Sequence, residues 1–132
     1  LRKLHPQILQ ATKESIETKN GRVKWDEKTD LLYVNSEFTA SIVLARCQQL
    51  DSGRRFWKVR LDTSLNPDIS VVVRLGPGNE EALDYYLLPR LDFGTSGLRL
   101  ADQNAMELES YRFDTLDYFY GMGAQTKLRR VA

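Results

Sequence analysis

Cysteine and histidine are almost absent from this 132-residue chain, which contains one residue of each. The single Cys47 excludes a disulfide within the chain, so we expect a reducing compartment. His5 is the only histidine and lies near the start of the sequence. We take this to exclude a Cys/His zinc cluster and a Ser/His/Asp triad built from one chain.

Long apolar runs and a charge imbalance are also missing. No run approaches the roughly 20 residues that a transmembrane helix needs, and the opening LRKLHPQ lacks the apolar core of a signal peptide. We therefore expect a cytoplasmic protein without a membrane partner. The net charge of +1 favours no class of partner. The start at Leu1 rather than Met suggests either a fragment of a longer protein or a processed chain.

The length fits one domain that buries a core without disulfides or metal. The stretch HPQILQATKESIETKNGRV predicts a helix at about residues 6–19, ended by an Asn-Gly pair. Two short apolar runs, at residues 23–25 and 31–34, flank a polar turn and predict a hairpin. This helix and hairpin form the expected N-terminal part of the domain, residues 1–35.

Helical spacing recurs in the next segment and near the end of the chain. Phe38, Ile42 and Ala45 share a helical stripe, and Asn35 or Ser36 before them can cap a helix. We therefore predict a second helix from residue 36. Near the end of the chain, Asp114 can cap a further helix that carries Leu116, Phe119 and Tyr120.

Strands are predicted between these two helices. FWKVRLD alternates between apolar and charged residues, which indicates a half-buried strand with Lys58 and Arg60 facing water. DISVVVRL and ALDYYLLP are apolar on both sides and flank the turn GPGNEE, while LRL is a short fourth candidate. We expect the following residues to be buried: Trp57, Val59, Leu61, Val71 and Val73. The predicted fold is α+β, a single domain with a mixed sheet of about four strands flanked by helices, in which residues 36–132 form the core.

The predicted order helix, four strands, helix resembles the core of the restriction-endonuclease-like, or PD-(D/E)XK, nucleases. The resemblance covers residues 36–121 and includes the Pro67–Asp68 pair. It implies a divalent metal held by an aspartate and a (D/E)-x-K motif, with the lysine assisting the attacking water. If Asp68 is the family aspartate, the second motif falls on Asp84, and Tyr86 replaces the lysine. A tyrosine is neutral at pH 7 and is no simple replacement for that lysine.

A second register of the same motif also lacks one group. With Asp62 as the family aspartate, the acid of the second motif falls on Val72 and the lysine position on Arg74. An arginine stays protonated at any useful pH. An Mg²⁺-dependent nuclease using Glu37, Asp68 and Asp84 therefore stays as an alternative, and otherwise we expect no cofactor.

Basic residues are clustered in two places despite the neutral total. Contacts to nucleic-acid phosphates depend on such local density rather than on net charge. The candidate nucleic-acid-binding residues are Arg54, Arg55, Lys58, Arg60, Lys127, Arg129 and Arg130.

The stretches WKVRLD, PDISVVVRL, LDYYLLP and LESYRFDTLDYF look similar to C-terminal accessory regions of some bacterial site-specific serine recombinases. This resemblance implies a DNA-associated accessory role without the catalytic domain of that family. We therefore expect a non-catalytic, DNA-associated accessory or interaction domain on a degenerate nuclease-like core, with duplex DNA as partner. A module that binds only another protein is the second alternative.

Overall fold

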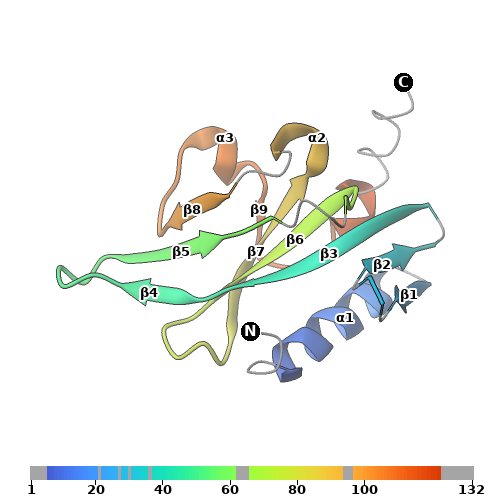
Figure 1. Ribbon diagram of the computed structural model, residues 1–132, viewed down its shortest axis with the longest axis horizontal. Helices are drawn as coiled ribbons and strands as arrows, with labels where there is room; N and C mark the ends of the chain where they lie inside the picture. Colours follow the sequence, from blue (N-terminus) through green and yellow to red (C-terminus); the bar gives the residue numbers. More distant parts are fainter. Residues whose placement is uncertain are drawn as a thin grey trace.

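The computed structural model describes residues 6–20, 22–26, 28–29, 31–35, 37–61, 66–93 and 97–122 (Figure 1). The chain passes through three short helices and nine strands in these residues. Their bounds are α1 Pro6–Asn20, β1 Val23–Asp26, β2 Leu31–Val34, β3 Phe38–Ala45, β4 Cys47–Gln49, β5 Arg55–Val59, β6 Ile69–Leu75, β7 Ala82–Pro89, α2 Arg90–Phe93, β8 Leu98–Ala101, α3 Met106–Glu109 and β9 Arg112–Phe113.

The strands form two sheets. The larger has six strands in the order β1-β2-β3-β6-β7-β9, and the smaller has three in the order β4-β5-β8. β3 and β6 pair in parallel, whereas the other pairs in both sheets are antiparallel, so the larger sheet is mixed. The α+β class and the mixed sheet are confirmed, with more strands than the four predicted.

The prediction of a second helix from residue 36 is wrong. This segment is β3 followed by β4, and it runs from the larger sheet into the smaller one (Figure 1). Phe38, Ala40, Ile42 and Leu44 are all buried and follow the two-residue period of a strand. Asn35 has a positive φ of 52° and belongs to the tight turn between β2 and β3, so it does not cap a helix. The helix-first element order behind the nuclease resemblance is therefore not present.

Two apolar clusters lie on opposite faces of the larger sheet. On one face, Ile16 of α1 packs with Val71 and Val73 of β6. On the other face, Val72 packs with Trp57 of the smaller sheet. The five side chains predicted to be buried are all buried, which confirms the strand assignments of β5 and β6: Trp57, Val59, Leu61, Val71 and Val73.

The helix predicted at residues 6–19 is confirmed as α1, and LRL is confirmed as part of β8. Near the end of the chain, residues 114–118 form bends and turns, and helical structure begins only at Phe119. Asp114 therefore does not start the helix predicted there. None of the helices in the described residues is long and apolar enough to cross a membrane.

Candidate nucleic-acid interface

Asp68, one of the three candidate metal ligands, is buried just before β6. Its carboxylate accepts hydrogen bonds from the backbone N–H of Thr39, at 2.9 Å, and from the Thr39 hydroxyl, at 3.3 Å. Its own backbone N–H donates to the Thr39 carbonyl at 3.0 Å. Asp68 thus joins the beginnings of β3 and β6, and its side chain is only 1% exposed.

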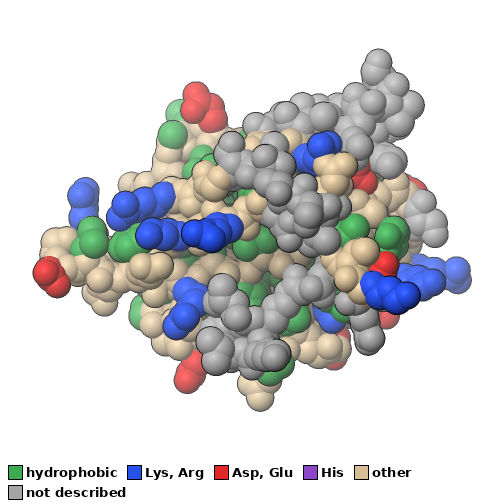
Figure 2. All heavy atoms as spheres, in the orientation of Figure 1, with side chains coloured by type: hydrophobic (Ala, Val, Ile, Leu, Met, Phe, Trp, Pro, Cys, Tyr) green, Lys and Arg blue, Asp and Glu red, His purple; other side chains and the backbone are tan. Residues whose placement is uncertain are grey.

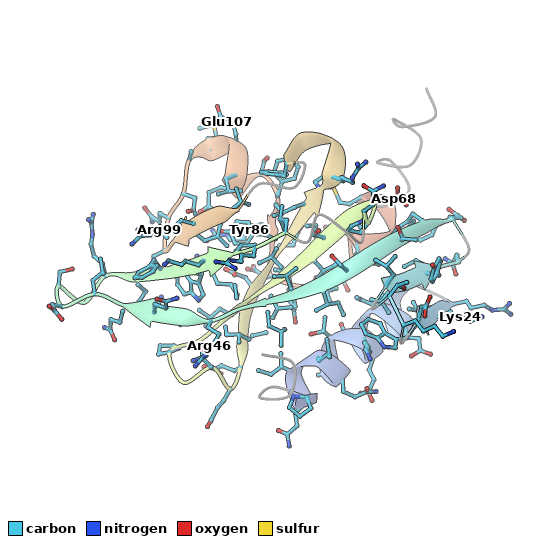
Figure 3. The ribbon with its side chains drawn as sticks, in the orientation of Figure 1. Lys24, Arg46, Asp68, Tyr86, Arg99 and Glu107 are labelled. Carbon is cyan, nitrogen blue, oxygen red and sulfur yellow. The ribbon has the colours of Figure 1, made fainter. Side chains whose placement is uncertain are left out.

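Asp84 lies far from Asp68 and is bound to an arginine. It pairs with Arg74 across β6 and β7, six residues beyond Asp68 along the sheet. At about 3.3 Å per residue, this places the two aspartates about 20 Å apart, too far to share a metal ion. Figure 3 shows Asp68 at the start of β6, away from Tyr86 in the centre of the molecule.

Glu37 lies in the exposed turn before β3, at the same end of the larger sheet as Asp68. It accepts a hydrogen bond of 2.6 Å from the Tyr120 hydroxyl. The structure does not bring Glu37 and Asp84 together, and the described residues contain no group of three or more His, Cys, Asp or Glu side chains suited to a metal ion. The carboxylates expected for a nuclease therefore serve as separate structural contacts.

A buried ion pair connects the two sheets. The Arg74 guanidinium donates two hydrogen bonds to Asp84, at 2.9 and 2.6 Å, and a third to the Ala101 carbonyl of β8, at 2.6 Å. It also lies 4.5 Å from the centre of the Trp57 ring. Burial alone would lower the pKa of Arg74, but hydrogen bonding and attraction by Asp84 outweigh it and raise the pKa. Arg74 is therefore a fixed internal cation that holds β8 against β6.

Tyr86 continues this polar layer toward α3. Its hydroxyl donates to Glu109 and accepts from the Asn104 side chain, both at 2.9 Å. Burial, followed by the hydrogen bond to Glu109, raises the pKa of Tyr86 to about 12. The residue expected at the lysine position of the nuclease motif is thus a neutral structural group.

The outward face of the smaller sheet carries exposed cations beside an aromatic ring. Lys58 of β5 is the direct partner of Arg99 of β8, so both side chains project from the same face. The Arg99 guanidinium lies 4.1 Å from the centre of the Phe56 ring. The inward residues of the same strands, Trp57 and Leu100, are completely buried. The alternation in β5 therefore directs its charge to solvent.

Three further arginines surround this pair. Gly53, with φ of 90°, allows the tight turn that leaves Arg54 exposed at the start of β5. Arg60 follows β5 and Arg46 precedes β4, and both are exposed. Figure 2 shows basic side chains gathered over β5 and β8. We call this set the basic face: Arg46, Arg54, Lys58, Arg60 and Arg99. Among the described residues, no carboxylate forms an ion pair with any of the five.

The Arg55 side chain lies on the opposite face of β5 from Lys58, because the two positions differ by an odd number of residues. It forms a bidentate ion pair with Asp102, just after β8. The hydrogen bond from Arg55 lowers the pKa of Asp102, and the same contact raises the pKa of Arg55. Arg55 therefore connects β5 to β8, and its charge is largely compensated within the protein.

Sequence reasoning located part of this surface. Of the predicted nucleic-acid-binding residues, Arg54, Lys58 and Arg60 meet on the basic face, whereas Lys127, Arg129 and Arg130 lie outside the described residues, as does Asp62. Arg46, Arg99 and Phe56 were missed. Arg99 is 41 positions beyond Lys58, so only the pairing of β8 with β5 brings the two together.

The Arg74–Asp84 pair did leave a signal in the sequence. Both residues are five positions from Asn79 in the turn GPGNEE, so a hairpin centred there places them opposite each other. Oppositely charged residues at such positions stabilise antiparallel strands.

Comparison of the chain with protein-family models, curated proteins and solved structures found no match.

Proposed function

We propose that this chain is a non-catalytic accessory domain that binds DNA through the basic face. The observation that carries the proposal is the pairing of Lys58 with Arg99 on the solvent side of a sheet whose other side carries the buried residues Trp57, Val59 and Leu100. Strand pairing fixes the spacing of these two charges, and the Phe56 ring restricts the Arg99 side chain. Ordered cations lose less side-chain entropy when they bind a phosphate.

The distribution of charge supports an anionic partner although the chain as a whole is nearly neutral. Among the residues that the structure describes, two acidic groups lie close to the basic face in the chain: Asp102 forms an ion pair with Arg55, and Asp51 lies in the turn between β4 and β5. A local excess of positive charge is what attracts and orients a phosphate backbone. Contacts of this kind position a protein on DNA without reading its sequence.

The occupied carboxylates support a role in binding rather than hydrolysis. The Asp68 carboxylate accepts hydrogen bonds from Thr39, and the Asp84 carboxylate accepts hydrogen bonds from Arg74. Releasing Asp84 to a metal would leave the buried Arg74 without its counter-ion, which is energetically costly. The recombinase resemblance implies a DNA-associated role and stays a prediction, whereas the nuclease resemblance has lost the helix-first element order on which it rested.

The test is a measurement of affinity by fluorescence anisotropy, with a labelled duplex of about 20 base pairs at about 50 mM salt. The variant Lys58→Glu/Arg99→Glu reverses the paired charges. The matched control, Lys24→Glu/Lys28→Glu, makes the same change in net charge at two exposed lysines of β1 and the turn after it. Figure 3 shows Lys24 and Arg99 at opposite ends of the molecule.

We expect the Lys58→Glu/Arg99→Glu variant to lose at least about tenfold in affinity, and the control less than about threefold, because phosphate contacts depend on local charge. Equal losses in the two variants would mean that only net charge matters. Absence of binding by the unmodified chain at low salt would reject the proposal and favour a module that binds another protein.

A further inference from the structure

A hollow of about 690 Å³ opens beside the basic face, between the turn that joins β4 to β5 and the end of β8. Sites for small organic groups fall in the range of about 300–1,000 Å³, so the hollow is large enough for a nucleobase with its sugar. The residues that matter for its chemistry are Arg54, Arg55, Phe56, Arg99, Asp102 and Gln103.

The wall of the hollow combines a stacking surface with positive charge. Phe56 and Arg99 form a ring-guanidinium pair at 4.1 Å, and both contribute to the wall. Aromatic rings and guanidinium planes are the surfaces on which proteins stack unpaired bases. The exposed Leu50 adds an apolar contact, and Gln103 adds an amide that can donate to or accept from a base edge.

The Arg55–Asp102 pair gives the hollow a fixed rim. Arg55 comes from β5 and Asp102 from the residue after β8, so their ion pair holds the two strand ends together on one side of the hollow. Arg54, which belongs both to the hollow and to the basic face, carries an exposed charge at its entrance. A phosphate at Arg54 would therefore place the adjoining base next to the ring-guanidinium pair.

We infer that this hollow receives one unpaired base of a DNA strand whose phosphates lie on the basic face. The base stacks against the Arg99–Phe56 pair. A base inside a duplex is covered by its neighbours and cannot enter, so the domain prefers single-stranded DNA, or a junction of single and double strands, over a continuous duplex. This inference rests on the proposed function, because the phosphates must first be held by the basic face.

The experiment uses a single strand of about 15 thymidines with 2-aminopurine at its centre, whose fluorescence responds to stacking. Affinities for this strand and for a duplex of equal length are measured for the unmodified chain, Phe56→Leu and Phe56→Tyr. Tyr33→Leu is the matched control, since Tyr33 is an exposed aromatic residue on β2, in the other sheet. Thermal unfolding of each variant checks that the fold is retained.

Binding of the unmodified chain should change the 2-aminopurine signal. Phe56→Leu should weaken single-strand binding by about fivefold to a hundredfold, the loss associated with one base stack, and duplex binding by less than about twofold. Phe56→Tyr keeps a ring and should restore single-strand affinity, while Tyr33→Leu should change neither affinity.

Two outcomes separate this inference from the proposed function. If duplex binding depends on Lys58 and Arg99 but 2-aminopurine does not respond, the inference is wrong and the proposed function stands. Equal weakening of single-strand and duplex binding by Phe56→Leu would also overturn the inference. If neither DNA binds at low salt, both are wrong.

Discussion

Removing the charge of Asp84 should destabilise the domain strongly, because it leaves a buried arginine without its counter-ion. The side chains of Arg74 and Asp84 are only 5% and 9% exposed and share two hydrogen bonds. In Asp84→Asn the shape of the side chain is kept, but its carboxamide can no longer neutralise the guanidinium. Water cannot replace the lost charge without opening the layer between the sheets.

Breaking a buried pair from one side costs about 3–5 kcal/mol, against a total stability of about 5–15 kcal/mol for a domain of this size. With a urea m-value near 2 kcal/mol/M, the unfolding midpoint should fall by about 2 M. The double variant Arg74→Met/Asp84→Leu removes both charges and should recover most of this loss. The Ala101 carbonyl released by Arg74 keeps a hydrogen bond of 3.1 Å from Asn104.

The assay is equilibrium unfolding in urea, followed by circular dichroism. Asp102→Asn is the matched control, because Arg55 and Asp102 form the same type of ion pair with side chains that are 33% and 47% exposed. An exposed pair contributes at most about 1 kcal/mol, so this variant should unfold near the midpoint of the unmodified chain. If Asp84→Asn costs no more than Asp102→Asn, the pair is not desolvated and the packing of the two sheets described here is incorrect.

Two further predictions concern the core and the pH dependence. Val73→Asp places an unpaired charge in the apolar cluster that includes Ile16 of α1, and it should prevent folding. The control Lys24→Asp changes an exposed residue and should keep the circular dichroism spectrum of the folded protein. A folded Val73→Asp protein would contradict the register of β6. Because the folded pKa of Tyr86 is raised to about 12, its contribution to stability is complete below the ordinary tyrosine pKa of 10 and is lost as the pH rises toward 12. Between pH 9 and pH 11.5, the free energy of unfolding should fall by about 2 kcal/mol less in Tyr86→Phe than in the unmodified chain. Equal falls in the two proteins would contradict this assignment.

The sequence was sufficient for β5 because its alternation has only one interpretation. Trp57 and Lys58 are neighbours of opposite character, and the two-residue period of a strand sends one inward and the other to solvent. The segment at β3 has no such contrast. Phe38, Ile42 and Ala45 fit a helical stripe, but Ala40 and Leu44 fill in the two-residue period equally well. Parallel pairing with β6 decides between these patterns, and a local pattern does not reveal that pairing.

The candidate interface was only half predictable for a related reason. Charge density along the sequence identified Arg54, Lys58 and Arg60, which lie within a few positions of one another. The contribution of Arg99 depends on strand pairing, and the neutralisation of Arg55 depends on Asp102, 47 positions away. The sequence shows which charged residues are neighbours in the chain, whereas strand pairing determines which of them are neighbours in space.

The central claim, that the basic face binds DNA through phosphates, is tested most directly by the salt dependence of duplex affinity. The measurement compares the slope of log K against log salt, between about 50 and 200 mM, for the unmodified chain, Lys58→Gln/Arg99→Gln and Lys24→Gln/Lys28→Gln. Each phosphate contact contributes about 0.9 to the slope, so neutralising Lys58 and Arg99 should make it shallower by about 1.8. Neutralising Lys24 and Lys28 should leave it unchanged. A slope that stays the same in Lys58→Gln/Arg99→Gln would show that neither side chain contacts a phosphate and would contradict the account.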